Sequence, residues 1–381
     1  MVVALLLVLQ AGSPAAPGAR ASFSPATFDP LVTDGIRRGA YPGAALVIGR
    51  RDTILFAKGY GHLTWSTASP AADPDSTLWD LASLTKVVAT TTSLMLLVER
   101  GRVDLDAPVR RYLPEFAAAD VTVRHLLTHT SGLRATLPLF RDAKDSADAL
   151  RMVLAQTPLV PPGSRMVYSD LNAILLGEIV RRVGWGGPLD VFATREIFVP
   201  LGLHQMLFRP GRQLVRRIAP TGVWRGHPVA GTVNDPNAAK LGGVAGHAGL
   251  FATASDLGRF AQFMLGDGAL PGGPRLLKAE TVQLFTKVAV PARRGSSART
   301  LGWEALPTGE DVSSAGALFG SRSYGHTGWT GTSIWIDPDR GLFVVLLTNR
   351  AYAPRARRPF TILKEVRGRV ADAAARAADA R

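Results

Sequence analysis

The feature that most constrains the fold of this 381-residue chain is an apolar run over residues 87–98, which Ser83 and Lys86 immediately precede. The run contains no Gly or Pro, so it is predicted to form a buried helix. Residues three positions apart share one face of a helix, with Cβ atoms roughly 5–6 Å apart. A seryl hydroxyl and a lysyl amine are therefore expected to meet at the beginning of this helix.

Ser83 and Lys86 are candidates for a nucleophile and its base. A hydroxyl is a weak nucleophile unless a neighbouring base takes its proton. An amine can do so near neutral pH only if its pKa falls, and burial among side chains such as Leu81, Leu84 and Val87 favours the neutral amine. At a helix N-terminus, the N–H group of Ser83 would also stabilise a developing oxyanion. The pair alone is a weak signal, because the alternative is an ordinary exposed pair on a helix.

The first 21 residues have the pattern of a secretory signal peptide. Residues 1–9 are almost wholly apolar, and Ala19-Arg20-Ala21 fits a small-x-small cleavage site. The apolar stretch is too short to span a membrane. We therefore expect a signal peptide over residues 1–21 and a secreted or periplasmic mature protein. The alternative is an uncleaved or incorrectly assigned start.

The chain carries a formal net charge of +14, nearly all of it from arginine, and has no cysteine. The arginines are scattered rather than clustered with aromatic residues, so nucleic acid is not expected as a partner. Weak association with anionic envelope polymers or membrane surfaces is one consequence of this charge, and a plain compositional preference for arginine is the alternative. The absence of cysteine excludes disulfides, thiolate metal sites and a cysteine nucleophile.

Strand patterns lie near both ends of the chain, with helical patterns between them. The predicted strands are residues 44–49, 53–60, 332–336 and 341–347. The predicted helices are residues 121–128, 171–183, 191–197, 255–265 (with Ser255 as its N-cap) and a tail that begins at residue 359. This order predicts an α+β fold in which both termini build one antiparallel sheet flanked by helices, with an all-α insertion. We expect residues 22–82 and 298–381 to form the sheet region and residues 83–297 a mainly helical region, together one catalytic unit.

A second group of polar residues, Tyr168-Ser169-Asp170, follows a break rich in Pro and Gly and precedes the helix predicted at 171–183. The break predicts a tight turn, and a tight turn can present its side chains to a ligand. The phenol of Tyr168 is therefore expected to relay a proton to a leaving group if a cation lies nearby.

A third group, His326-Thr327-Gly328, comes shortly before the strand predicted at 332–336. On an edge strand, a Thr-Gly pair leaves main-chain donors free, and Gly328 lets a substrate approach the backbone closely. The N–H of Trp329 is then expected to be the second oxyanion donor, opposite that of Ser83.

In their order and separations, Ser83-x-x-Lys86, Tyr168-Ser169-Asp170 and His326-Thr327-Gly328 resemble the three motifs of the penicillin-recognising serine enzymes. The most similar branch contains class C β-lactamases, D-Ala-D-Ala carboxypeptidases and related esterases. Residues 125–133 and 325–331 are similar to further signatures of this family, and residues 242–251 resemble a subgroup of periplasmic serine hydrolases. The resemblance spans residues 23–350, and the three motifs together are far more specific than any one of them.

The resemblance implies a β-lactamase/transpeptidase-like fold with the nucleophile at the junction of an α/β region and an all-α region. It implies an acyl-enzyme on Ser83 that water then hydrolyses, with Lys86 and Tyr168 sharing the proton transfer and with no cofactor. The substrate would be a small ester, a cell-wall D-Ala peptide or a β-lactam. The residues expected to contact it are Asp170, His326, Thr327 and Gly328.

Two residues depart from the family pattern. The third motif usually begins with Lys, whereas His326 is neutral over much of the physiological range and would attract a substrate carboxylate only toward acid pH. This favours esters or amides without a carboxylate. The second motif commonly ends in Asn, whereas an ionised Asp170 accepts hydrogen bonds but does not donate them, so its expected partner is Lys86.

Several alternatives stay open. His125 and His129 have a spacing found in metal sites, but Leu126 stands where a metalloprotease motif needs Glu, so no metal is expected. The Gly-rich run 242–249 lacks the strand and helix that flank a dinucleotide loop. His247 within this run is expected either to border the cleft as a substrate-binding residue or to pack locally. The same fold could also serve a non-catalytic module that binds a ligand or is acylated without turnover.

Overall fold

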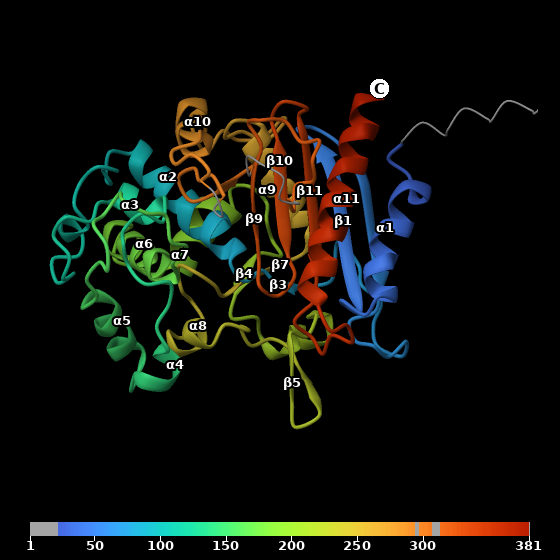
Figure 1. Cartoon of the computed structure of the whole chain (residues 1–381), viewed down its shortest axis with the longest axis horizontal. Helices are drawn as coiled ribbons and strands as arrows, with labels where there is room; N and C mark the ends of the chain where they lie inside the picture. Colours follow the sequence, from blue (N-terminus) through green and yellow to red (C-terminus); the bar gives the residue numbers. More distant parts are fainter. Residues whose placement is uncertain (1–21, 294–296, 307–312, 381) are drawn as a thin grey trace, which may run out of the picture.

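Strands from opposite ends of the chain lie side by side in the computed structural model, which describes residues 22–293, 297–306 and 313–380 (Figure 1). Six strands form one sheet in the order β2-β1-β11-β10-β9-β8. They are β1 (Gly43–Arg50), β2 (Ile54–Gly61), β8 (Glu304–Ala305), β9 (Tyr324–Thr327), β10 (Ser333–Asp337) and β11 (Leu342–Thr348). β1 pairs with β11 in antiparallel register, from Ala44 opposite Thr348 to Arg50 opposite Leu342. The prediction of one antiparallel sheet built from both termini is confirmed, while the predicted signal peptide lies outside the described residues.

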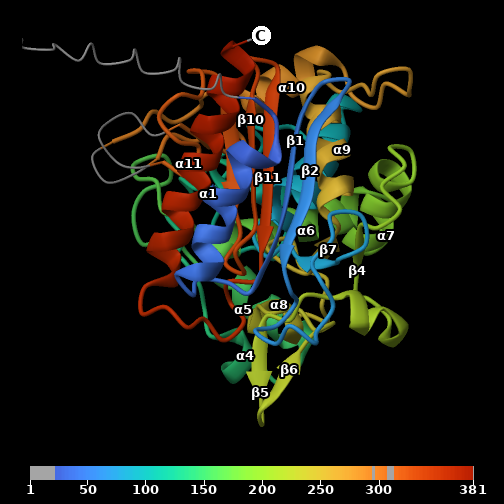
Figure 2. The ribbon, with the colours of Figure 1, turned by 90° about the vertical axis from the view of Figure 1, so that its right-hand side faces the viewer.

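Alternate residues of the central strand β1 enter two different cores. Ala44, Leu46 and Ile48 belong to the core that contains α1 (Pro25–Arg37) and α11 (Pro359–Asp379), two helices that lie against each other on one face of the sheet (Figure 2). Ala45 and Val47 belong to the core on the other face, where α9 (Ala254–Leu265) packs. Because both faces are covered, β1 and β11 are apolar almost throughout, whereas most residues of the edge strand β2 are exposed or half-buried.

The middle of the chain is mainly helical, as predicted (Figure 1). Its α-helices other than α9 are α2 (Thr92–Glu99), α3 (Val123–Leu127), α4 (Leu139–Asp142), α5 (Ser146–Leu154), α6 (Asp170–Val183), α7 (Leu189–Ala193), α8 (Pro236–Lys240) and α10 (Ala279–Thr286). Leu94 of α2 and Ile179 of α6 share a core with Ile334 and Val345 of the sheet. The helical region and the sheet therefore pack on one another through a common hydrophobic core. None of the helices in the described residues is long and apolar enough to cross a bilayer.

Shorter elements connect these helices. They are the π-helical turns η1 (Lys86–Thr91) and η3 (Thr194–Phe198), the 3₁₀ turns η2 (Val109–Arg111) and η4 (Arg212–Arg217), and the strands β3 (Trp79–Asp80), β4 (Leu207–Phe208), β5 (Gly222–Trp224), β6 (His227–Val229) and β7 (Leu250–Ala252). β7 lies between β3 and β4 in a small sheet, and β5 pairs with β6 in a hairpin. The small sheet matters for function because β3 leads directly into the turn that carries Ser83.

The apolar run predicted as a buried helix is helical and largely buried, although it begins with the π-helical turn η1 before it continues as α2. One local prediction, that of Ser255 as a helix N-cap, was wrong. In α9 the N-cap is Thr253, whose hydroxyl accepts a hydrogen bond from the N–H of Asp256 at 3.2 Å. Ser255 instead lies within the first turn of the helix and donates its hydroxyl to Asp75. Thr253 rather than Ser255 caps the helix because Thr253 has the extended backbone of a cap residue.

Gly246 is the point where the Gly-rich segment, residues 242–249, touches helix α6. A Cβ atom at this position would lie 1.9 Å from the carbonyl oxygen of Ala173 and 3.0 Å from the nitrogen of Gly177. The carbonyl of Gly246 also accepts a hydrogen bond from the hydroxyl of Thr90 at 2.7 Å. Only glycine allows this backbone-to-backbone packing between the segment, α6 and η1.

We expect Gly246→Ala to destabilise the protein by about 2 kcal/mol, typical of overpacking against atoms that cannot move aside. Urea unfolding followed by circular dichroism measures this change. The matched control is Gly187→Ala, since a Cβ at Gly187 meets no atom within 4 Å. Equal unfolding midpoints for the two variants would contradict the packing described here.

Candidate active site

Ser83 lies in a strained turn that buried Asp80 holds in place. Ala82, the residue before the nucleophile, has φ of +48°, a conformation unfavourable for a residue with a Cβ. The carboxylate of Asp80 accepts hydrogen bonds from the N–H of Ala82 at 2.9 Å and from the N–H of Asn234 at 2.7 Å. Burial raises the pKa of Asp80 to about 6, so the carboxylate is ionised at neutral pH and can accept both bonds.

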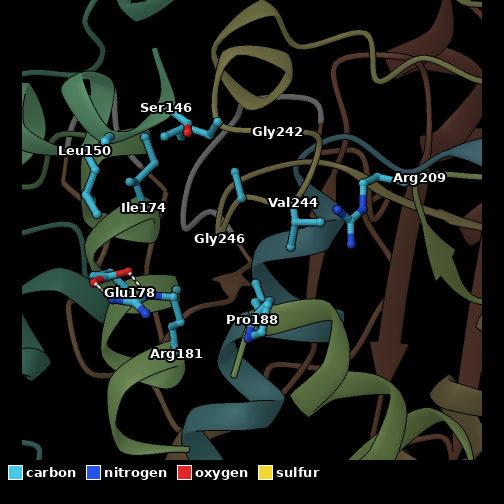
Figure 3. Close-up of a pocket in the computed structure, with 15 residues that line it drawn as sticks. Ser146, Leu150, Ile174, Glu178, Arg181, Pro188, Arg209, Gly242, Val244 and Gly246 are labelled. Atoms are coloured by element: carbon cyan, nitrogen blue, oxygen red, sulfur yellow. Dashed lines mark hydrogen bonds and ion pairs between the residues drawn. The ribbon is translucent and has the colours of Figure 1, made fainter. Parts of the chain in front are cut away.

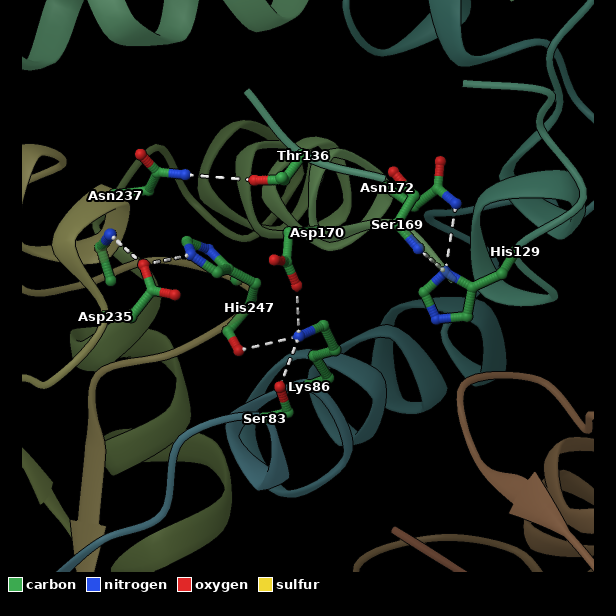
Figure 4. A network of polar contacts seen from close by, with 12 residues as sticks. Ser83, Lys86, His129, Thr136, Ser169, Asp170, Asn172, Asp235, Asn237 and His247 are labelled. Carbon is green, nitrogen blue, oxygen red and sulfur yellow. Dashed lines mark hydrogen bonds and ion pairs between the residues drawn. The ribbon is translucent and has the colours of Figure 1, made fainter. Parts of the chain in front are cut away.

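The Lys86 ammonium group is the centre of the site (Figure 4). Its Nζ lies 2.9 Å from the Ser83 hydroxyl, 2.8 Å from the Asp170 carboxylate and 3.2 Å from the carbonyl oxygen of His247. It also lies 5.0 Å from the centre of the Tyr168 ring. The first two motifs are thus brought together, and Asp170 has the partner expected for it.

The protonation of Lys86 differs from the sequence-based expectation. Burial does oppose its charge, but the attraction of Tyr168 and Asp170 outweighs burial and raises the pKa of Lys86 above its ordinary value. The expectation that burial leaves a neutral amine was therefore wrong for this arrangement. A protonated Lys86 donates to the Ser83 hydroxyl and cannot take its proton.

His129 positions the second motif, a role that sequence reasoning missed. Its Nδ1 accepts a hydrogen bond from the N–H of Ser169 at 3.2 Å and lies 3.2 Å from the side-chain amide nitrogen of Asn172. Its ring packs 4.7 Å from that of Tyr168, centre to centre. Burial and the nearby charge of Arg299 hold the pKa of His129 well below its usual range, so the ring is neutral and Nδ1 remains an acceptor. The sequence signal for it was the similarity of residues 125–133 to a family signature.

The third motif lies beside the turn that carries Ser83. Gly328 packs so closely that a Cβ there would lie 2.5 Å from the carbonyl oxygen of Leu81. Two hydroxyls of the segment that follows Gly328 bind main-chain carbonyls of the same turn. The Thr332 hydroxyl donates to the carbonyl of Leu81 at 3.0 Å, and the Thr330 hydroxyl donates to the carbonyl of Asp80 at 2.7 Å. The pairing of β8 with β9 covers Gly325 and Tyr324 and stops short of Thr327.

The N–H groups of Ser83 and Trp329 donate to no other protein group in the part of the chain that the structure describes. Both residues flank the contact between Gly328 and the turn before Ser83. Their pairing as an oxyanion hole stays a prediction, and this geometry is compatible with it.

His326 is buried and neutral throughout the physiological range. Its Nδ1 lies 2.9 Å from the carbonyl oxygen of Thr327, and its ring packs 5.9 Å from that of Tyr168, centre to centre. Burial, together with the positive charges of Arg299 and Lys86, lowers the pKa of His326 to about 3. The expectation that His326 gains charge toward mildly acid pH was therefore wrong, because the neighbouring cations oppose its protonation.

Arg299 is the second functional candidate that sequence reasoning missed. It is 7 % exposed, and its Nε and Nη1 atoms are buried without a hydrogen-bond partner in the described residues. Its guanidinium carbon lies 5.3 Å from the centre of the Tyr168 ring. A buried guanidinium with unused donors is costly unless a ligand supplies the acceptors. No spacing in the sequence distinguishes Arg299 from the other arginines.

His247 lies behind Lys86 rather than in the cleft. Its side chain is 1 % exposed, and its Nε2 lies 3.0 Å from the carboxylate of Asp235, the N-cap of α8. Contact with Lys86 is made by the main-chain carbonyl of His247. The interpretation of His247 as a substrate-binding side chain was therefore wrong, and the alternative of local packing holds.

A cavity of about 370 Å³ opens on the other side of the Gly-rich segment (Figure 3). It is lined by α5, α6 and residues 241–246, and none of the three motifs reaches it. Its buried carboxylate, Glu178, is already paired with Arg181 and Arg182, each at 2.7 Å. The cavity is thus separate from the catalytic residues and holds no unsatisfied charge.

No three His, Cys, Asp or Glu side chains gather as metal ligands within the described ranges. The two histidines with metal-like spacing serve different local structures. Nδ1 of His125 accepts the N–H of Thr122 in a capping box at the start of α3, whereas His129 turns toward Ser169.

Comparison with known proteins identifies the family. The sequence model of the Beta-lactamase family matches residues 28–367. An Escherichia coli (strain K12) protein named "Putative D-alanyl-D-alanine carboxypeptidase" is 31% identical over 358 residues, covering 83% of this chain and 80% of the relative. A protein of the same name from Salmonella agona (strain SL483) is 30% identical over 361 residues, with the same coverage.

Solved structures share the fold. EstCE1, described as a hydrolase with promiscuous acyltransferase activity, aligns with a TM-score of 0.72 at 22% identity, covering 90% of this chain and 98% of its own. A class C β-lactamase aligns with a TM-score of 0.70 at 21% identity, covering 90% and 95%. The chain therefore belongs to the β-lactamase family, and its fold and relatives define a serine hydrolase of the β-lactamase and penicillin-binding-protein type.

We expect Asp170→Asn to move one limb of the pH profile of kcat/KM to lower pH by about one unit, because the amide removes a negative charge that holds the Lys86 proton. If protonated Lys86 is required, the alkaline limb moves and activity above neutral pH falls. If neutral Lys86 is the base, the acid limb moves and activity below neutral pH rises. Asp142→Asn, which removes an exposed carboxylate on α4, is the control. An unshifted profile would show that Asp170 does not govern the Lys86 proton.

Proposed function

We propose that the protein is an exported acyl-serine hydrolase that acts on acyl-D-alanyl peptides or related acyl donors bearing a carboxylate, as a D,D-carboxypeptidase does. The observation that carries this proposal is the buried Arg299 guanidinium, with two unpaired nitrogens beside Tyr168 and His326. A carboxylate supplies both the negative charge and the acceptor oxygens that a cationic group with unused donors needs. The names of the E. coli and Salmonella relatives agree with this substrate class, and export rests on the pattern of residues 1–21.

The chemistry follows from the contacts of Lys86. Ser83 Oγ would attack the scissile carbonyl carbon while its proton passes to the phenolate form of Tyr168, which thereby becomes the phenol, since protonated Lys86 cannot accept the proton. The ammonium of Lys86 would stabilise that phenolate before it takes the proton, and the N–H groups of Ser83 and Trp329 would bind the oxyanion. Tyr168 would then return the proton to the leaving amine as the carbon–nitrogen bond breaks. Water would release the acyl group from Ser83 by the same steps in reverse.

The alternative to a hydrolase is a protein of the same fold that is acylated on the serine but does not turn over. A fluorescent penicillin distinguishes the two, because a hydrolase loses the label with time, whereas a trap keeps it. Ser83→Ala should take up no label in either case, and it serves as the blank for every assay of this site.

We expect Arg299→Gln to lower kcat/KM for an N-acylated D-Ala-D-Ala peptide by roughly 30- to 100-fold, the loss typical of a charge-assisted hydrogen-bond pair. The same peptide with a C-terminal carboxamide should lose no more than about threefold, since it offers no carboxylate. Arg299→Lys should recover part of the difference by restoring charge without the planar fork. The two peptides are compared by following D-alanine or D-alanine amide release.

The matched control is Arg151→Gln, an exposed arginine on α5 paired with Asp148, which should leave both peptides unchanged. An equal loss on both peptides would mean that Arg299 only supports the fold around Tyr168. No loss on either would mean that the substrate carboxylate binds elsewhere, and the assignment of this substrate class would fail.

A further inference from the structure

The β5–β6 hairpin projects from one end of the molecule, away from the sheet and the helical region (Figures 1 and 2). Its two-residue turn, Arg225-Gly226, has positive φ at both positions, which matches the twist of the paired strands. Trp224 at the tip is 69% exposed and Val223 beside it is 49% exposed. Two large apolar side chains are thus presented to the surroundings by a well-defined turn.

The segment that carries the hairpin and η4 is rich in arginine. Residues 197–234 contain five arginines and no Asp or Glu. Of these, Arg212, Arg216 and Arg225 are exposed and form no ion pair within the described ranges. Arg216 of η4 and His227 of β6 line the same groove, so η4 lies next to the hairpin. The hairpin and η4 together form a basic surface with an apolar tip.

The hairpin has a fixed orientation relative to the catalytic residues. At its base, the side-chain amide of Asn234 donates to the carbonyl of Thr221 at 3.0 Å, and that of Asn349 donates to the carbonyl of Pro220 at 3.3 Å. Asn234 is also the residue whose N–H binds Asp80 beneath the Ser83 turn. A partner that binds the hairpin would therefore also fix the orientation of the active site relative to that partner.

We propose that the β5–β6 hairpin and η4 dock on the surface of an anionic lipid bilayer. Tryptophan favours the headgroup region of a membrane, and arginines beside it attract anionic lipids. Three residues of β-strand extend roughly 10 Å, which matches the depth reached by interfacial elements. A soluble polyanion would need the arginines alone, whereas exposed Val223 and Trp224 indicate an apolar phase beneath the charged layer.

The chain offers a matched control for this proposal. Trp185 is 53% exposed and has Arg195 over its ring at 4.8 Å, as Trp224 has Arg225 over its ring at 5.7 Å. Its surroundings differ in charge, because Asp190 and Glu196 lie on the adjoining turns and pair with arginines there. The two tryptophans therefore match in exposure and cation contact but not in local charge.

The test is co-sedimentation of the mature chain with vesicles of phosphatidylcholine alone and of phosphatidylcholine containing phosphatidylglycerol. We expect wild type to bind the anionic vesicles at least about tenfold more tightly than the neutral ones. Trp224→Ser and the double substitution Arg212→Gln, Arg216→Gln should each weaken binding to anionic vesicles about tenfold. Trp185→Ser should stay within about twofold of wild type. Hydrolysis of a soluble substrate should be unchanged in every variant, which verifies folding.

Three results would overturn the proposal. The first is equal weakening by Trp224→Ser and Trp185→Ser, which would show non-specific adhesion. The second is equal binding to neutral and anionic vesicles. The third is binding to heparin that the arginine substitutions weaken and Trp224→Ser does not, with no binding to vesicles, which would indicate a polyanion partner.

Discussion

The ammonium group of Lys86 is the contact on which the site depends, because three separate parts of the chain meet there. The turn before η1 supplies Ser83, helix α6 supplies Asp170, and the Gly-rich segment supplies the carbonyl of His247. A charge that is 4% exposed must be neutralised and fully hydrogen-bonded, or its burial would destabilise the fold. The same requirement that stabilises the buried lysine therefore fixes the distance between the nucleophile and the second motif. Gly246 then becomes a structural requirement, since any side chain there would push the adjoining carbonyl away from Lys86.

The turn that carries Ser83 is strained, and hydrogen bonds from other parts of the chain stabilise it. Ala82 has an unfavourable backbone conformation, and the ionised Asp80 carboxylate compensates by accepting hydrogen bonds from both sides of the turn. The third motif adds two hydroxyl contacts, from Thr330 and Thr332, to the main-chain carbonyls of the same turn. Because these contacts come from distant positions in the chain, the turn is held by the completed tertiary structure rather than by its local sequence.

Sequence patterns predicted the large features well because those features repeat. The apolar character of β1 and β11 follows from their position in a sheet that is covered on both faces, and the order of elements along the chain then indicates the sheet. The three motifs placed Ser83, Lys86, Tyr168 and Asp170 correctly as a group. Protonation states could not be predicted this way, since they depend on which charges converge in space. Arg299 illustrates the limit: it looks like any other arginine until the fold buries it against Tyr168.

Arg299 also accounts for the departure at position 326. A lysine in that buried position would add a third cation to a site that already contains Lys86 and Arg299, with Asp170 as the carboxylate in direct contact with Lys86. Like charges in a buried environment repel strongly, so such a lysine would lose its proton or destabilise its neighbours. A neutral imidazole avoids that cost and still packs against Tyr168. The positive charge that the family pattern places in the third motif comes here from a different segment of the chain, from the Arg299 guanidinium beside Tyr168. The substitution of His for Lys therefore moves the source of positive charge rather than removing it from the site.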